Sequence, residues 1–177
     1  MHKNDDELIA LRELDEECPG PNELESALSN DTLGEVETQP PLVLESSTSL
    51  ADTNRLMQAE RRACALLVED GRLAGIFTER DVLMKLAGSD IDLERTAVAE
   101  AMTRDPVTFS TEASVAQALN MMVVEGFRHI PLVDERGHPT GMVSMRDLID
   151  YLTDFFGKDV LNLPPDPSGS FRSRDGA

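Results

Sequence analysis

An internal repeat, at an offset of 65 to 66 residues, constrains the fold more than any other feature of the sequence. Residues 75–83 (GIFTERDVL) and 141–149 (GMVSMRDLI) share Gly, a hydroxyl residue, Arg and Asp in register, and most of their other positions are apolar. The likeness continues upstream, where residues 67–70 align with 132–135. Because the match covers whole supersecondary units, we conclude that the chain contains two copies of one structural unit.

Each copy predicts the element order β-α-β-β-α. A short β run follows a proline at residues 42–44 and 107–109, and Ser/Thr-rich residues then provide caps for amphipathic helices over 49–60 and 114–125. Two β runs joined by a glycine turn come next, at 65–68 and 74–77 in the first copy and at 130–133 and 141–143 in the second. The second helices begin at Thr78 and Ser144, with an apolar face made of Val82, Leu83 and Leu86 or of Leu148, Ile149 and Leu152.

This unit, which ends in Gly, two apolar residues and [Thr/Ser]-x-x-Asp, resembles the cystathionine β-synthase (CBS) domain family. The resemblance implies a mixed α/β (α+β) fold in which two repeats pack through their sheets into a pseudo-two-fold Bateman module, with clefts that bind adenine-containing ligands. We expect the repeats over residues 36–90 and 97–157. An acidic, largely flexible extension over 1–35 and a flexible tail over 158–177 would flank them.

The [Thr/Ser]-x-x-Asp signature places a hydroxyl and a carboxylate side by side at the start of a helix. There the carboxylate can accept hydrogen bonds from the vicinal diol of a ribose, and exposed helix N–H groups favour an anion nearby. Thr78 with Asp81, and Ser144 with Asp147, are therefore the candidate ribose-binding residues. The same pattern is also an ordinary capping box, and the two roles are compatible.

Candidate phosphate ligands lie before the second strand of repeat 2, where Arg128 and His129 look like a basic pair that meets ligand phosphates in the CBS family. Arg128 offers a planar fork of donors and His129 a further donor. Repeat 1 has residues 63–64 (Ala-Cys) at the aligned positions, so the repeat 2 site, with Arg146 as a third candidate, ranks first. Alternatively, Arg128 and His129 offset nearby acids, while Arg146 and Arg80 pair with carboxylates on their own helices.

The net charge of −18 excludes a general nucleic-acid binder, because phosphate backbones require positive potential. Residues 1–40 carry 12 acids and 2 bases, so the acidity is concentrated in the first part of the chain. No apolar stretch approaches the roughly 20 residues of a membrane span, and the N-terminus lacks the features of a secretion signal, which points to the cytoplasm. Cys18 and Cys64 are too few for a disulfide framework or a four-ligand metal site.

These observations favour a regulatory module over an enzyme, since no catalytic set and no metal-ligand spacing is present. We expect no resident cofactor, and a ligand such as AMP, ADP, ATP or S-adenosylmethionine between the repeats, whose binding is transmitted to an unknown effector protein. A homodimer through exposed apolar helix sides, including Phe155 and Phe156, is the expected assembly. The alternative is a ligand-free scaffold in which the CBS pair only dimerises and docks, and both signatures serve as caps.

Overall fold

The computed structural model describes residues 21–154. Outside this part of the chain lie residues 1–20 and 155–177, which include Phe155, Phe156 and the predicted tail. The elements follow in the order α2 (Pro21–Asn30), β1 (Val43–Glu45), α3 (Leu50–Ala59), β2 (Cys64–Glu69), β3 (Arg72–Thr78), α4 (Glu79–Asp81) continued by a π-helical stretch (Val82–Leu86), a 3-10 turn (Val98–Glu100), β4 (Thr103–Arg104), α5 (Val115–Glu125), β5 (His129–Val133), β6 (Pro139–Ser144) and α6 (Met145–Thr153).

The first repeat forms a four-stranded sheet in the order β1-β2-β3-β4. Strand β1 is parallel to β2, whereas β3 is antiparallel to both β2 and β4. The apolar sequence of β2 is buried over Cys64–Val68, and its residues Ala65 and Leu67 share a core with Leu50 of α3 and Phe77 of β3. Strand β4 lies in the stretch predicted to begin repeat 2, yet it pairs with β3. This stretch, residues 103–107, is called the linker below, and it is fixed to the sheet of repeat 1.

The second repeat differs from the prediction at its first strand. Residues 107–109 form no strand, and Phe109 makes only an isolated parallel bridge with Leu132. In repeat 1 the backbone N–H of Leu66 donates to the Leu42 carbonyl at 2.8 Å, which extends the parallel ladder. The residue aligned with Leu66 is Pro131, which has no N–H, so the same hydrogen bond cannot form and the ladder stops at Phe109.

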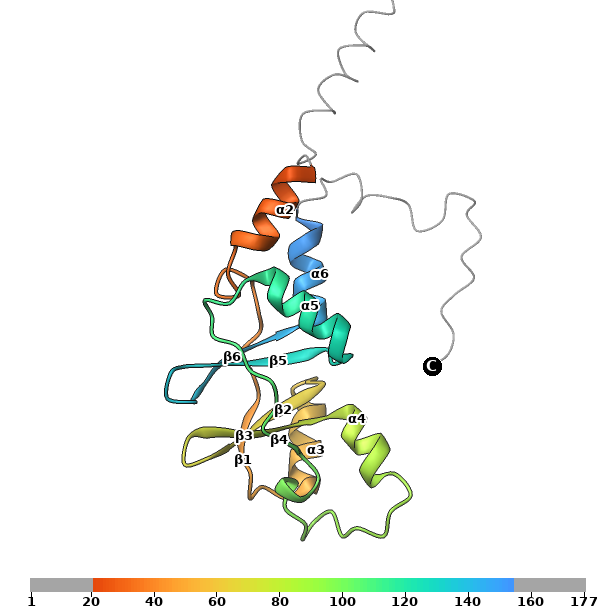
Figure 1. Ribbon diagram of the computed structural model, residues 1–177. Coiled ribbons are helices and arrows are strands. Elements are labelled where there is room, and N and C mark those ends of the chain that lie inside the picture. The colour runs from red at the N-terminus through yellow and green to blue at the C-terminus, as the bar shows by residue number, and fades with distance from the viewer. Residues whose placement is uncertain (1–20, 155–177) are drawn as a thin grey trace, which may run out of the picture.

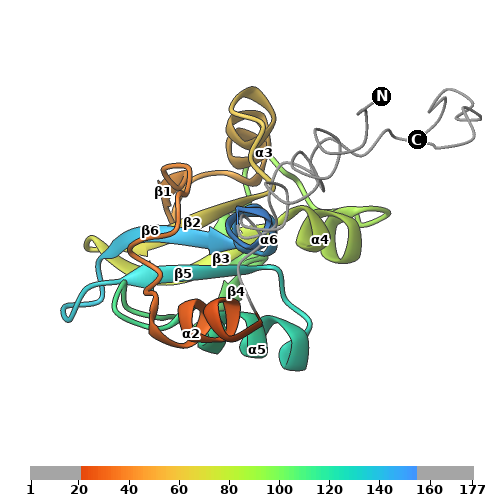
Figure 2. The same ribbon diagram turned by 90° about the horizontal axis from the view of Figure 1, so that it is seen from above.

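The N-terminal residues that the structure describes pack on repeat 2, although they precede repeat 1 in sequence. Helix α2 lies beside α5 in both views (Figures 1 and 2). Leu33 is buried in the core of repeat 2, and its N–H donates to the Ala113 carbonyl at 2.9 Å. The Tyr151 hydroxyl of α6 donates to Asp31 at 2.5 Å. A buried leucine and backbone hydrogen bonds thus hold residues 31–34 to repeat 2, although the sequence analysis places them in the extension over 1–35.

The second helices bury fewer apolar residues than predicted. Val82 and Leu86 pack inward, but Leu83 is 69% exposed, and in α6 Leu148 is buried while Ile149 is 50% exposed. Residues four apart share one helix face, whereas the residue next in sequence lies about 100° around the axis. The expected apolar faces were therefore too wide, and Leu83 and Ile149 belong to the surface.

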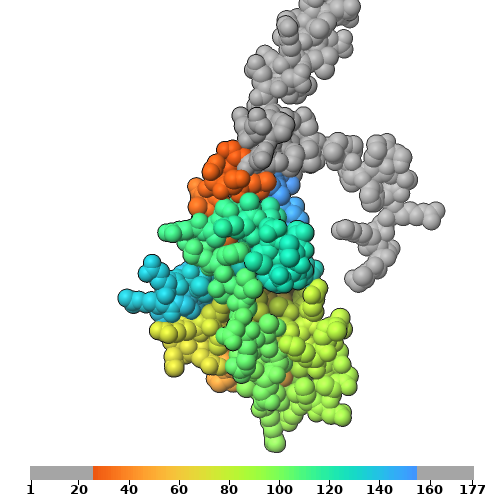
Figure 3. Space-filling view, viewed as in Figure 1, coloured from red at the N-terminus to blue at the C-terminus, as the bar shows by residue number. Residues whose placement is uncertain are grey.

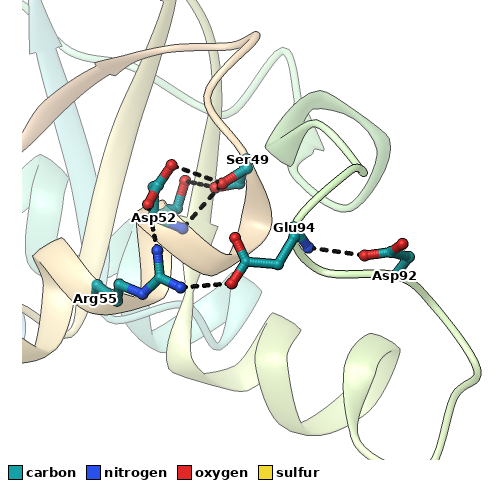
Figure 4. Close-up of polar contacts among 6 residues, drawn as sticks. Ser49, Asp52, Arg55, Asp92 and Glu94 are labelled. Carbon is teal, nitrogen blue, oxygen red and sulfur yellow. Dashed lines mark hydrogen bonds and ion pairs between the residues drawn. The ribbon is translucent and has the colours of Figure 1, made fainter.

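The loop after the first repeat is fastened to the start of α3. Arg55 lies between two carboxylates, with Nη1 at 2.7 Å from Asp52 and Nη2 at 2.5 Å from Glu94 (Figure 4). The Ser49 side chain caps α3 by accepting from the Asp52 N–H, and the Leu50 N–H donates to the Thr96 carbonyl at 2.9 Å. These contacts fix the path of the chain that leads into β4.

The two repeats meet through their sheets, as the fold class predicted from the sequence requires. In Figure 1 the sheets lie against each other at the centre, with α2, α5 and α6 on one side and α3 and α4 on the other. Met142 of repeat 2 packs against a cluster of repeat 1 that consists of Cys64, Leu66 and Ile76. No helix within residues 21–154 has both the length and the hydrophobicity needed to cross a bilayer.

Candidate functional site

A cleft of about 370 Å³ lies between the two repeats. Its wall is contributed by the start of α4, by the linker after β4 and by the segment between α5 and β5. The face in Figure 3 shows the green linker descending from the second repeat beside α4. The lining residues are Ala63, Ile76, Thr78, Glu79, Arg80, Asp81, Thr103, Asp105, Pro106, Val107, Gly126, Phe127, Arg128 and His129.

The start of α4 supplies a fixed hydroxyl and carboxylate. Asp81 accepts hydrogen bonds from the Thr78 N–H at 2.9 Å and from the Thr78 hydroxyl at 2.7 Å, and its own N–H donates back to that hydroxyl. The other carboxylate oxygen lies 2.7 Å from Lys85 Nζ. Asp81 is only 7% exposed, so its orientation is set by the capping box and the ion pair. The Asp81 oxygen beside Lys85 retains a lone pair that can accept a hydrogen bond from a ligand hydroxyl.

The equivalent residues of repeat 2 have the same local geometry in a different place. Asp147 accepts from the Ser144 N–H and from the Ser144 hydroxyl, both at 2.7 Å, and so forms a second capping box at the start of α6. Neither residue lines the cleft. The two signatures therefore share a capping role, and Thr78 with Asp81 also faces the space between the repeats.

Repeat 2 contributes its basic pair to the same cleft. Gly126 ends α5 with φ of 74°, and the chain then turns so that Phe127, Arg128 and His129 line the wall opposite α4. Burial, followed by the positive charge of Arg128, lowers the pKa of His129 below 6.5, although Asp147 and Glu79 act in the opposite direction. The imidazole is therefore uncharged at neutral pH and can offer one donor and one acceptor.

The linker closes the third side and depends on a glycine. Gly75 of β3 pairs with Arg104 of β4, and a Cβ at Gly75 would lie 2.5 Å from Met102 Sδ and 2.8 Å from the Thr103 carbonyl oxygen. Only a residue without a side chain lets β4 approach this closely. The linker then presents Val107 and its neighbours as an apolar wall.

The structure groups the predicted residues differently from the sequence analysis. Thr78 and Asp81 of repeat 1 share the cleft with Arg128 and His129 of repeat 2. Arg146, the third candidate phosphate ligand, does not line the cleft; its Nε lies 3.6 Å from Asp150 on the same helix, and its side chain is 88% exposed. The aligned arginine of repeat 1, Arg80, does line it.

Sequence reasoning did not identify Glu79, the linker residues or the apolar wall. No motif marks the linker, because its position depends on the pairing of β4 with β3. Glu79 occupies the first x of the [Thr/Ser]-x-x-Asp signature, a position at which the motif specifies no residue type. Across residues 21–154, no group of three or more His, Cys, Asp and Glu side chains is arranged to hold a metal ion.

Comparison with protein families gives two matches to one family model, described as the CBS domain, at residues 33–88 and 98–154. Together these matches cover more than half of the chain. The first match begins at Leu33, which contributes to the core of repeat 2.

Two curated relatives show how such pairs occur in other proteins. An uncharacterized 17.7 kDa protein of Acidianus ambivalens is 30% identical over 131 residues, which cover 71% of this chain and 78% of that protein. The meiotically up-regulated gene 70 protein of Schizosaccharomyces pombe is 30% identical over 107 residues, 60% of this chain but only 15% of that protein. The chain therefore spans most of the first relative and a small part of the second.

Solved structures share the arrangement of the two repeats. The CBS domain protein NE2398 is 25% identical, with a TM-score of 0.64 over 70% of this chain and 98% of that one. The CBS domain pair of protein MJ0100, solved with 5'-methylthioadenosine and S-adenosyl-L-methionine, is 21% identical with a TM-score of 0.62 over 70% and 96%. CBSX2, solved with AMP, is 20% identical with a TM-score of 0.63 over 70% and 97%. At 20–21% identity, the similarity to the latter two structures shows a shared fold and nothing more.

Proposed function

The chain belongs to the CBS domain family, and from this premise we propose that it is a regulatory module that binds an adenosyl ligand in the cleft between its repeats. One observation carries the proposal: the Thr78–Asp81 capping box of repeat 1 and the Arg128–His129 pair of repeat 2 line one cleft. Relatives of the same fold that were solved with AMP, or with 5'-methylthioadenosine and S-adenosyl-L-methionine, support this ligand class.

The cleft offers a partner for each part of such a ligand. The carboxylate of Asp81 and the hydroxyl of Thr78 suit the vicinal diol of the ribose. The guanidinium of Arg128 suits a phosphate or carboxylate. The side chains of Ile76 and Val107 provide an apolar surface for the base. A volume of about 370 Å³ lies within the range of roughly 300–1,000 Å³ typical of small-molecule sites.

Binding would act on the relative position of the repeats. A ligand that touches both repeats stabilises whichever arrangement it binds more tightly, and this differential affinity shifts the population. We propose that a cytoplasmic homodimer transmits the shift to an effector protein, without catalysis by this chain and without a resident cofactor. The exposed apolar side chains that can pair two copies are Leu83, Met84, Val123, Val124 and Ile149.

Thermal unfolding of matched variants tests the ligand site. AMP, ADP, ATP and S-adenosylmethionine are added separately to the wild type, to Asp81→Asn and to Asp147→Asn. A ligand at 100 times its Kd stabilises by about 2.7 kcal/mol, which raises the Tm by roughly 5–10 °C for a chain of this size. Asparagine keeps an acceptor oxygen for the helix cap, so both variants should fold. We expect Asp81→Asn to lose the shift and Asp147→Asn to keep it.

The other outcomes identify the alternatives. If Asp147→Asn alone loses the increase in Tm, the ribose site lies in repeat 2, which is the site that the sequence analysis ranks first. If none of the four compounds raises the Tm of the wild type, the sensor proposal fails. The ligand-free dimerisation and docking scaffold would then be favoured, because the exposed Leu83, Met84, Val123 and Val124 suit protein contacts.

A further inference from the structure

The charges of the cleft are nearly balanced. Among residues 21–154, the arginines that line it are Arg80 and Arg128, and the acids are Glu79, Asp81 and Asp105. Lys85 lies 2.7 Å from Asp81 and compensates that carboxylate. The remaining carboxylates of Glu79 and Asp105 oppose the two guanidinium groups, so the cleft has little surplus positive charge for a polyanion.

The histidine of the cleft does not change this balance at neutral pH. Burial and Arg128 together lower the pKa of His129, so its imidazole carries no charge there. Glu79 acts on the same imidazole in the opposite direction, as a negative charge close to it would. The carboxylate of Glu79 therefore lies within electrostatic reach of the residues that would hold a phosphate.

Glu79 also distinguishes the two copies of the signature. Thr78 and Asp81 form the capping box, while the Glu79 backbone N–H donates to the Ala63 carbonyl at 3.0 Å and its exposed side chain lines the cleft. The aligned residue of repeat 2 is Met145, which packs partly buried against the core of that repeat. The cap needs no acid at this position, so the carboxylate of Glu79 is available for another role.

We propose that Glu79 is a specificity-determining residue that makes the cleft prefer an adenosyl ligand with at most one phosphate over the corresponding di- and triphosphates. The inference rests on the proposed function, because it concerns the same cleft. Each further phosphate adds about one negative charge, which Glu79 and Asp105 repel and which no additional cation among the described lining residues balances. A cationic sulfonium, as in S-adenosylmethionine, is attracted by the same carboxylate.

Calorimetric titration of AMP, ADP, ATP and S-adenosylmethionine, without divalent cations, tests this role in the wild type and in Glu79→Gln. Two unit charges about 8 Å apart, at an effective dielectric constant of about 40, interact strongly enough to change affinity roughly fivefold. We therefore expect Glu79→Gln to lower the Kd of ADP about fivefold relative to that of AMP, and that of ATP further. The Kd of S-adenosylmethionine should rise, and both effects should shrink as salt is added.

Glu135→Gln is the matched control, because Glu135 is exposed in the turn between β5 and β6 and the substitution removes the same charge. Its ratio of ATP to AMP affinity should equal that of the wild type. The inference is overturned if Glu79→Gln and Glu135→Gln have the same ratio while AMP still binds. If no adenosyl ligand binds the wild type, the proposed function fails and the inference fails with it.

Discussion

Replacing Leu33 by alanine should destabilise repeat 2, although Leu33 precedes repeat 1 in the sequence. The side chain is 1% exposed and belongs to the same core as Val115 of α5 and Ile130 of β5. The backbone around it is fixed, because the Leu33 N–H donates to the Ala113 carbonyl at 2.9 Å and the Gly34 N–H to the Thr111 carbonyl at 2.8 Å. The substitution therefore leaves a cavity that the chain cannot easily close.

The expected loss follows from the burial of the side chain. Leucine-to-alanine changes in protein cores cost about 2–5 kcal/mol, and the cost is larger where the site cannot collapse. The fixed backbone at residues 33–34 places this site near the middle of that range, at about 3 kcal/mol. For a chain of this size each kcal/mol lowers the Tm by about 2–4 °C, so the Tm should fall by roughly 6–12 °C.

Urea unfolding followed by far-ultraviolet circular dichroism measures the change, as a lower midpoint with an unchanged slope. Leu83→Ala is the control, because Leu83 is 69% exposed and its truncation should alter the free energy of unfolding by no more than about 0.5 kcal/mol. A loss below about 1 kcal/mol for Leu33→Ala would refute the conclusion that residues 31–36 complete the core of repeat 2.

Two further predictions concern the linker and the acid stability. Gly75→Ala should displace β4, because its Cβ would lie 2.5 Å from Met102 Sδ, and should weaken AMP binding about tenfold in calorimetry, or roughly 1.4 kcal/mol. Gly141→Ala is the control, because its Cβ would lie no closer than 3.4 Å to a neighbouring atom, Leu132 Cδ1, and this variant should bind AMP as the wild type does. Equal AMP affinities of the two variants would contradict the role of β4. The hydrogen bond from His138 lowers the pKa of Asp134 from 3.8 to about 2, so this carboxylate contributes stability that is present above pH 3.8 and lost as the pH falls toward 2. Asp134→Asn should therefore show a smaller fall in the free energy of unfolding between pH 4 and 2, and a fall as steep as that of the wild type would contradict this assignment.

The repeat and most of its elements could be predicted because they depend on local patterns. The helix starts at Thr78 and Ser144 were found at the right residues, since a capping box is a local signal three residues apart. Strands β2 and β5 followed from short apolar runs. The expected strand at 107–109 was wrong because the hydrogen bond that it needs comes from another segment, where Pro131 has no N–H to donate.

The packing of residues 21–35 could not be predicted for a related reason. Leu28 and Leu33 are two of the apolar residues of a largely polar segment, and nothing local indicates which core they join. The segment also lies closer in sequence to repeat 1 than to repeat 2. Its place became clear only from long-range contacts, such as the hydrogen bond between Tyr151 and Asp31.

The composition of the cleft follows from the pseudo-symmetry of the module. The Glu79 N–H donates to the Ala63 carbonyl at 3.0 Å, and the Met145 N–H donates to the Arg128 carbonyl at 2.9 Å, so each signature adjoins the segment before the second strand of its own repeat. This local neighbourhood suggested that Arg128 serves the signature at Ser144. Arg128 instead lines the same cleft as the signature of the other repeat.

The two repeats contribute different chemical groups to this cleft. Repeat 2 supplies Arg128 and the uncharged His129 to the cleft at Asp81, whereas the aligned residues of repeat 1 are Ala63 and Cys64. Ala63 lines this same cleft. The Arg128–His129 pair occurs in repeat 2 alone, and it lines the cleft that contains Asp81. The acid proposed to limit its charge, Glu79, occurs in repeat 1 alone, because Met145 is the aligned residue of repeat 2. In the proposed site, Arg128, which would bind a phosphate, and Glu79, which would limit the number of phosphates, thus belong to different repeats, so the proposed selectivity depends on the packing between them.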